Sequence, residues 1–216
     1  MPVWSDILKN LVVAHEQLFI GWLLGLLAPA VVETIRRTRR VKLLERALAQ
    51  ELHELQYFMF LKAFVLRDRA VKLDDDFLVW LNKVGSEYKG KEPIKPFLAM
   101  WQDLRKIDQS LRGKFDPRRG LSLSEGEAPL LSIHTNEIAL FSISSQVWLL
   151  SVSRQLSLFN QQVVYLRRLF DKTFDNLSDV SRAALRQNLE DGYESLAQRA
   201  IAIADLIRSA PPSLKA

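Results

Sequence analysis

Few side chains in this sequence could bind a metal or transfer a proton. The chain has three histidines, His15, His53 and His134, and no cysteine. His53 lies in the stretch ELHE, which matches neither the H-E-x-x-H zinc motif nor the E-x-x-H motif of di-iron bundles. The lack of cysteine excludes disulfides, iron–sulfur clusters and thiol catalysis. We therefore expect no metal site and no cofactor.

Motifs for nucleotide binding and for nucleophilic catalysis are also missing. The sequence contains no G-x-x-x-x-G-K-[ST], no G-x-G-x-x-G and no G-x-S-x-G. The cation pairs Arg167–Arg168 and Arg118–Arg119 could bind a phosphate or a carboxylate, but a solvated surface explains them more simply. The sequence therefore predicts no catalytic residue and a protein that is not an enzyme.

Positive charge is concentrated in one short segment. The chain has a formal net charge of +5, and an acid-free stretch contributes five cations: Arg36, Arg37, Arg39, Arg40 and Lys42. A protein that binds nucleic acid generally spreads its cations over a face or stripe, and single-strand binders place aromatic residues among them. This segment has no such aromatics, so we expect no nucleic-acid partner.

The most apolar stretch of the chain directly precedes these cations. The run Gln17–Val32 is 16 residues long and uncharged, and extending it to 14–35 gives 22 residues with Glu16 and Glu33 near the ends. A bilayer core of about 30 Å needs about 20 helical residues. We therefore predict a transmembrane helix over residues 14–35. The cations after it place residues 1–13 outside and the rest of the chain in the cytoplasm, in the cell (inner) membrane.

Two other interpretations of this stretch stay open. Residues 18–32 could form the core helix of a soluble all-α interaction protein. The triplet APA at Ala28–Ala30 resembles a signal-peptide cleavage site, but the cations follow the apolar run instead of preceding it. If the span exists, it could tether the protein or assemble into a pore.

Two kinds of site follow from the predicted span. Gly21 and Gly25 form a G-x-x-x-G pair that would let two helices approach closely, which makes them candidate residues for helix packing. The five cations are candidates for setting the topology and for contacting lipid headgroups. The predicted partners are thus the lipid bilayer and either another protein or a second copy of the chain.

Helical periodicity continues after the cations. No glycine or proline lies between Pro29 and Gly85, so one helix can extend to about Arg69. Asp74–Asp76 can cap a following short helix. We group residues 36–112 as the basic juxtamembrane segment and first helices, including an amphipathic helix from Phe97 to Leu111. Residues 113–129 follow as a loop, the best place to look for a partner contact.

Two long helical patterns fill the last part of the chain, which we predict to be a helical hairpin over 130–210 with a frayed tail at 211–216. The first, from about 132 to 174, contains a heptad seam: Leu156, Phe159, Val163, Leu166 and Phe170. The second repeats the spacing after a cap at Ser178: Leu185, Leu189, Leu196, Ala200, Ile203 and Ile207. Residues 138–152 could be a second span, but their serines favour a bundle helix.

The predicted fold is therefore all-α: a single N-terminal transmembrane helix that continues into a cytoplasmic antiparallel helical bundle. The heptad seams could instead form a coiled coil between chains. The predicted function is that of a membrane-anchored, non-enzymatic protein whose bundle mediates protein interaction or self-assembly. The alternatives are the soluble interaction protein and an enzyme or ligand-binding bundle with a pocket near His53 or His134.

Overall fold

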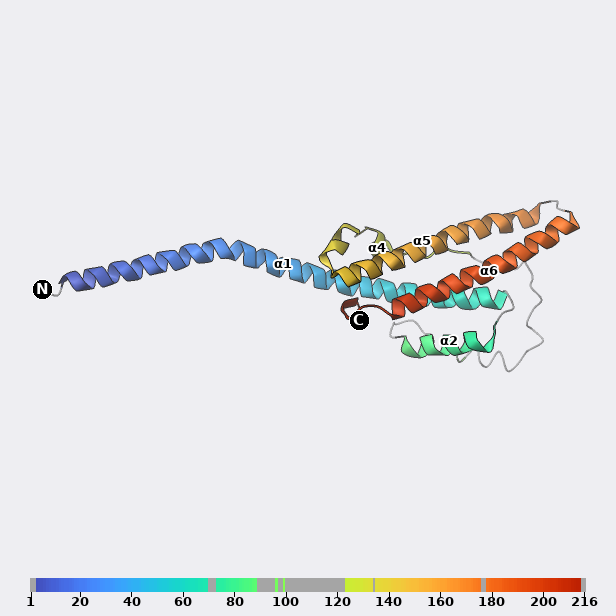
Figure 1. The fold of residues 1–216 in the computed structure, drawn as a ribbon, viewed down its shortest axis with the longest axis horizontal. Coiled ribbons are helices and arrows are strands. Elements are labelled where there is room, and N and C mark those ends of the chain that lie inside the picture. The colour runs from blue at the N-terminus through green and yellow to red at the C-terminus, as the bar shows by residue number, and fades with distance from the viewer. Residues whose placement is uncertain are drawn as a thin grey trace. The chain divides into compact units, whose positions relative to one another are not determined.

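Helices make up the regular structure of this chain, as its periodicity predicts (Figure 1). A computed structural model describes residues 3–69, 73–88, 96, 99, 123–133, 135–175 and 178–214; for residues 3–21, 23, 24, 69, 133, 135, 136 and 213 it describes the backbone alone. Within these ranges there is no strand, so the all-α prediction is confirmed. The predicted amphipathic helix at Phe97–Leu111 lies outside them, apart from residue 99.

The helices are α1 (Val3–Arg69), α2 (Asp75–Glu87), α4 (Pro129–Ile133), α5 (Ile143–Asp171) and α6 (Asp179–Arg208). Short 3₁₀-helices η1, η2 and η3 cover Thr135–Leu140, Lys172–Phe174 and Pro212–Leu214. α1 continues without interruption to Arg69, as the absence of glycine and proline after Pro29 predicts. Pro29 itself lies inside this helix. The chain divides into two units, Met1–Glu45 and Arg46–Ala216. They are called the first and second units below.

The core of the second unit is built around the two predicted seams. Leu156, Phe159, Val163 and Leu166 are buried on α5, and all six apolar seam residues of α6 are buried. Figure 1 shows α5 and α6 side by side and antiparallel. Leu48, Leu52 and Leu55 of α1 are also buried. The helical bundle is therefore confirmed, whereas a coiled coil between chains is not supported, because these seams are already buried within one chain.

The predicted continuous helix from 132 to 174 is wrong. α4 and η1 precede a break at Ser142, where the backbone is extended and the hydroxyl accepts a hydrogen bond from the N–H of Ser145. This cap starts α5 at Ile143. On the first turns of α5, Leu149 and Val152 are buried while Ile143 and Val147 are exposed, which is the pattern of a bundle helix.

Two further caps agree with the sequence. The Asp74 carboxylate accepts a hydrogen bond of 2.8 Å from the N–H of Phe77 and starts α2. Ser178 accepts from the N–H of Ser181 at 3.2 Å and starts α6. Short polar side chains before an apolar-periodic run satisfy amides that have no partner within the helix.

Polar contacts join α2 to other helices of the second unit. The Trp80 indole N–H donates to Asp205 of α6, at 3.1 Å from Oδ1. The Arg67 guanidinium of α1 pairs with Asp74 at 3.2 Å and with Glu194 of α6 at 3.3 Å. Trp80 also stacks on Phe60 and Phe77. These contacts combine apolar packing with charge pairing at one end of α1.

The transmembrane helix predicted over 14–35 is not supported by the structure. Among the residues searched, which are those the structure describes, no helix has both the length and the apolar character needed to cross a bilayer. The side chains of residues 14–21, 23 and 24, which belong to the predicted span, lie outside the description.

Candidate functional site

Exposed apolar side chains distinguish the first unit. Six of them are between 45 and 62 % exposed: Trp22, Leu26, Leu27, Val31, Val32 and Ile35. Successive helical residues are rotated by about 100°, so these six positions lie around the whole circumference of α1. The apolar surface therefore surrounds the helix, whereas the helix of an ordinary globular protein has one apolar face.

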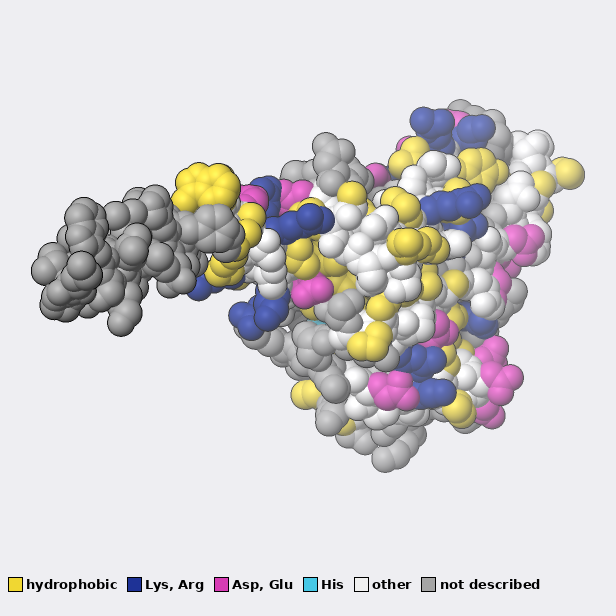
Figure 2. All heavy atoms as spheres, turned by 60° about the vertical axis from the view of Figure 1, so that its left-hand side comes forward, with side chains coloured by type: hydrophobic (Ala, Val, Ile, Leu, Met, Phe, Trp, Pro, Cys, Tyr) yellow, Lys and Arg dark blue, Asp and Glu magenta, His cyan; other side chains and the backbone are white. Residues whose placement is uncertain are grey.

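The five predicted cations directly follow this apolar surface. Arg36, Arg37, Arg39, Arg40 and Lys42 are all exposed on α1. The same rotation of about 100° per residue distributes them around the helix and not along one face. Figure 2 shows apolar side chains in yellow and cations in dark blue next to one another at the surface of the first unit. The exposed cations at 36–42 therefore directly follow the exposed apolar side chains at 22–35 along the same helix. These five cations are called the belt of cations below.

Two threonine side chains in this region donate hydrogen bonds to carbonyls of their own helix. Thr34 Oγ1 donates to the carbonyl of Ala30 and Thr38 Oγ1 to the carbonyl of Thr34, both at 2.8 Å. Gly25 is exposed, and a Cβ added there would meet no atom within 4 Å. The side chain position of Gly21 lies outside the described residues, so the predicted G-x-x-x-G contact stays a prediction.

A second candidate site lies in the second unit, where residues 123–131, here called the strap, pack between α1 and α5. Leu123, Ala128 and Leu131 of the strap are buried. A Cβ at Gly126 would lie 2.8 Å from Met59 Cε of α1 and 2.8 Å from Leu156 Cδ1 of α5. A side chain at this position would force the ends of Met59 and Leu156 to move, so the strap backbone lies close to both helices.

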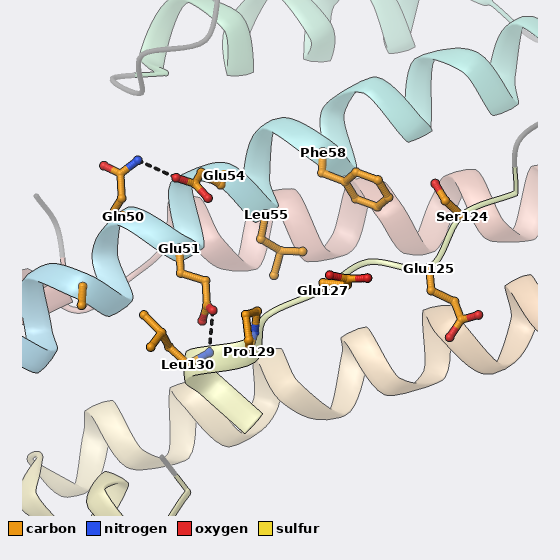
Figure 3. Close-up of a pocket in the computed structure, with 11 residues that line it drawn as sticks. Gln50, Glu51, Glu54, Leu55, Phe58, Ser124, Glu125, Glu127, Pro129 and Leu130 are labelled. Carbon is orange, nitrogen blue, oxygen red and sulfur yellow. Dashed lines mark hydrogen bonds between the residues drawn. The ribbon is translucent and has the colours of Figure 1, made fainter. Parts of the chain in front are cut away.

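Glu51 of α1 holds the end of the strap. Its side chain is only 8 % exposed, and its two carboxylate oxygens accept hydrogen bonds from the N–H groups of Leu130, at 2.6 Å, and Leu131, at 3.0 Å. These amides belong to the first turn of α4, where the helix itself provides no acceptor. Figure 3 shows Glu51 extending from α1 to Leu130. The buried charge is thereby matched by two donors and by the helix terminus.

Two polar side chains of α5 hold the rest of the strap. Asn160 accepts from the N–H of Gly126 at 2.8 Å and donates to its carbonyl at 2.9 Å, so one amide satisfies both backbone groups of that glycine. Arg167 donates to the carbonyl of Leu123 and pairs with Glu125 at 2.9 Å. Nearby, burial and then repulsion from Arg167 lower the pKa of Lys62 below its ordinary value of 10.5.

Between α1 and the strap lies an open depression, here called the acidic groove. It has a volume of about 800 Å³, and its lining includes Glu51, Glu54, Glu125 and Glu127 together with the apolar side chains of Leu55 and Phe58. Figure 3 shows Leu55 and Phe58 extending from α1 toward the strap. None of the 11 lining residues is a lysine or arginine. The groove therefore combines negative charge with an apolar floor.

Sequence analysis missed the residues that hold the strap. Glu51 looked like a solvated charge on the polar face of a helix, and Arg167 like part of a solvated pair. Asn160 carried no motif. The signals available were a glycine and Pro129 close together in the predicted loop, which mark a backbone that approaches others closely. The partner helices could not be identified from them. Residues 113–122 of that loop lie outside the described residues.

Of the three histidines, only His53 has a side chain that the structure describes. The His53 ring lies edge-on to Tyr88 with 6.3 Å between centroids, and Tyr88 Oη lies 3.5 Å from the His53 carbonyl. Across the described part of the chain, no three histidine, aspartate or glutamate side chains form a group that could hold a metal ion. His134 and the side chain of His15 lie outside the described residues.

Comparison with known proteins adds no relative to this picture. No protein-family model matches the chain, and no curated protein and no solved structure is similar to it.

Proposed function

We propose that this chain is a membrane-anchored, non-enzymatic helical protein. In this proposal the segment 14–35 enters the bilayer, and the second unit binds a protein partner or a second copy of the chain. The observation that carries the proposal is the exposed apolar surface that surrounds α1 in the first unit. A helix that is apolar on all sides is stable in a protein core or in a membrane.

The length and composition of the segment support the bilayer. Its 22 residues correspond to about 33 Å of α-helix, close to the hydrocarbon thickness of about 30 Å. Thr34 already donates to the carbonyl of Ala30 in its own helix, so no bond to water is lost by its hydroxyl proton in lipid. Pro29 is tolerated in a membrane helix because neighbouring groups can satisfy the carbonyl that it leaves without a donor.

The belt of cations supports the orientation. Charges distributed around the helix meet the headgroup layer from every side, and each is worth about 1 kcal/mol near an anionic leaflet. By the positive-inside rule, the cations and the second unit then lie on the cytoplasmic side of the cell (inner) membrane, and the N-terminus lies outside. A tether requires only this arrangement, whereas a pore would require several copies.

Fractionation of cells that express the full chain tests the proposal. We expect the protein in the membrane fraction, retained in carbonate and released by detergent. A reporter that is active only in the cytoplasm should work at the C-terminus and not at the N-terminus. Release by carbonate contradicts the proposal and favours the soluble interaction protein. A C-terminal reporter found outside contradicts the proposed orientation.

A further inference from the structure

The acidic groove of the second unit has more negative charge than its own contacts neutralise. Glu51 is used by the amides of α4, and Glu125 pairs with Arg167. Glu54 accepts a hydrogen bond of 2.9 Å from the neutral amide of Gln50, and no lysine or arginine pairs with Glu54 or Glu127 in the part of the chain that the structure describes. Two carboxylates at the edge of the groove therefore face solvent without a cation.

The floor between these carboxylates is apolar and partly accessible. Leu55 is buried, Phe58 and Leu130 are half-buried, and Ala47 and Pro129 are exposed. Covering such a surface removes apolar area from water at a gain of about 25 cal/mol per Å². A hydrated metal ion or a small polar cation would gain nothing from this floor. The occupant that fits both parts of the groove carries positive charge and apolar groups together.

The walls of the groove are held in place before anything binds. Glu51 and Asn160 fix the strap to α1 and α5, and Gly126 packs against both helices. A site whose shape exists in advance loses less conformational freedom on binding. Gln50, Glu54, Glu125 and Glu127 on the lining are exposed, so the groove is open to solvent among the residues that the structure describes. Open access suits a segment of a polypeptide more than a small molecule enclosed on most sides.

We propose that the acidic groove binds a lysine- or arginine-rich amphipathic segment of a protein partner. Lysine and arginine place an aliphatic stem on an apolar surface while the charged end reaches a carboxylate, and leucine-like neighbours cover the accessible parts of Phe58, Leu130 and Pro129. Opposite charge sets the orientation and speeds association, and the apolar contact stabilises the complex. This inference deepens the proposed function, because it assigns a chemistry to the protein partner of the second unit.

The test uses the full chain in nonionic detergent and a synthetic amphipathic peptide of leucine and lysine at helical spacing. Two comparison peptides carry glutamate in place of lysine, or the same number of lysines without leucine. Binding is followed by fluorescence anisotropy, with chain-free micelles as a blank. We expect the leucine–lysine peptide to bind more tightly than either comparison peptide, and more weakly in high salt.

Matched variants assign the binding to the groove. Glu54→Gln with Glu127→Gln should weaken binding about tenfold, the sum expected for two exposed ion pairs. Asp171→Asn with Asp175→Asn removes the same charge from exposed positions that do not line the groove and should leave binding unchanged. Ala47→Trp places a bulky side chain on the floor from an exposed position and should also weaken binding. Circular dichroism checks that each variant is folded.

Carboxyl labelling read by mass spectrometry gives a second measurement that background binding to micelles does not affect. The peptide should protect Glu54 and Glu127, and not Asp171 and Asp175. Three results overturn the inference: equal weakening by both charge pairs, equal binding of the lysine peptide without leucine, or no protection in the groove. Since no membrane is used, failure here is separate from failure of membrane attachment, which fractionation reports.

Discussion

In the first unit, leucine, valine and isoleucine side chains are exposed around a single helix, whereas in the second unit the same residue types form a core between helices. Leu27 is 51 % exposed, while Leu149 of α5 and Leu189 of α6 are 0 % exposed. The second unit contains the partners that its apolar side chains need. Among the residues that the structure describes, the first unit contains no element other than α1, so the exposed apolar side chains of this helix do not form a core as those of the second unit do.

The polar residues differ between the two regions in the same way. In the first unit the cations are exposed around the helix, and the threonine hydroxyls bond to their own turn. In the second unit polar side chains connect elements that are far apart in sequence, as Glu51 and Asn160 do with the strap. The first unit thus presents its side chains to its surroundings, whereas the second unit uses many of its side chains for contacts between its own elements. Substitutions in the first unit should therefore change membrane retention, and substitutions in the second unit should change the stability of the fold.

The largest effect is expected from charge within the first unit. Leu26→Lys with Leu27→Lys places two cations near the centre of the segment 14–35, at about 3 kcal/mol each in membrane insertion. We expect the protein to leave the membrane fraction while the thermal unfolding of the second unit is unchanged. The control, Val79→Lys with Val180→Lys, makes the same change at exposed positions of the second unit. Equal loss from the membrane in both variants would remove the assigned role of the first unit.

The converse substitution acts on the core of the second unit. Phe159 is 0 % exposed, and Phe159→Ala should lower the free energy of unfolding by about 3–5 kcal/mol through lost contacts and the cavity left behind. Urea denaturation followed by circular dichroism measures this loss. Tyr165→Ala truncates a 57 % exposed aromatic residue on the same helix and should change stability by less than about 0.5 kcal/mol. Membrane retention of folded Phe159→Ala protein should be normal.

Loss of the carboxylate that holds the strap should have a smaller effect. Glu51→Ala leaves the N–H groups of Leu130 and Leu131 without their acceptor, at a cost of about 1–3 kcal/mol. Hydrogen exchange of these two amides should accelerate, and the urea midpoint should fall. Glu54→Ala, three residues further along α1 and exposed, is the matched control. Unchanged exchange at both amides in Glu51→Ala would mean that the strap is held by other contacts.

One glycine in each unit provides a direct comparison. A Cβ at Gly192 would lie 2.2 Å from Leu166 Cδ2, so Gly192→Ala overpacks the contact between α5 and α6. Overpacking costs about 1–3 kcal/mol, and the helix propensity of alanine offsets about 1 kcal/mol, which leaves a net loss of about 1 kcal/mol. Gly25→Ala meets no atom within 4 Å and should not destabilise the chain. A calorimetric midpoint lowered by both substitutions would contradict this difference.

The smallest effect concerns pH and the second unit alone. The pKa of Lys62 is lowered in the folded state by burial and by Arg167, so folding makes this ammonium easier to deprotonate. Between the lowered pKa and 10.5 the unfolded chain binds more protons, and the free energy of unfolding should therefore rise with pH in that alkaline range. Lys62→Met should remove this rise, whereas Lys83→Met, at an exposed position, should keep it. Urea midpoints at neutral and alkaline pH measure the difference.

The spacing of apolar residues and the positions of capping residues predicted most of the fold of the second unit. The seam residues from Leu156 to Leu166 are buried as expected, and Asp74 and Ser178 cap helices where expected, because these features depend on residues close together in sequence. The strap was not predicted, because Glu51 bonds to an amide 79 residues away. The sequence does not distinguish a buried carboxylate from an exposed one, because it does not show which hydrogen-bond donors offset the cost of removing the charge from water.

The break before α5 was missed for a related reason. Ser142 is one of several serines in the stretch from Ser132 to Ser153, and each of them could have been a cap or a helical residue. Phe141 and Leu149, on the two sides of the break, are both buried, and the sequence does not show which apolar residues pack in the core. Single-residue propensities differ too little to make that choice.

The contact between Asn160 and Gly126 involves only the backbone of the strap. Exposed strap side chains such as Glu125 and Glu127 are therefore free to change in a distant relative, whereas Gly126 should stay small and Leu123, Ala128 and Leu131 should stay apolar. Glutamate on the first helix, glycine three residues before proline, and asparagine seven residues before arginine on a later helix together make a sparse search pattern. This pattern of residues would identify relatives that keep the contacts of the strap after overall sequence similarity has been lost.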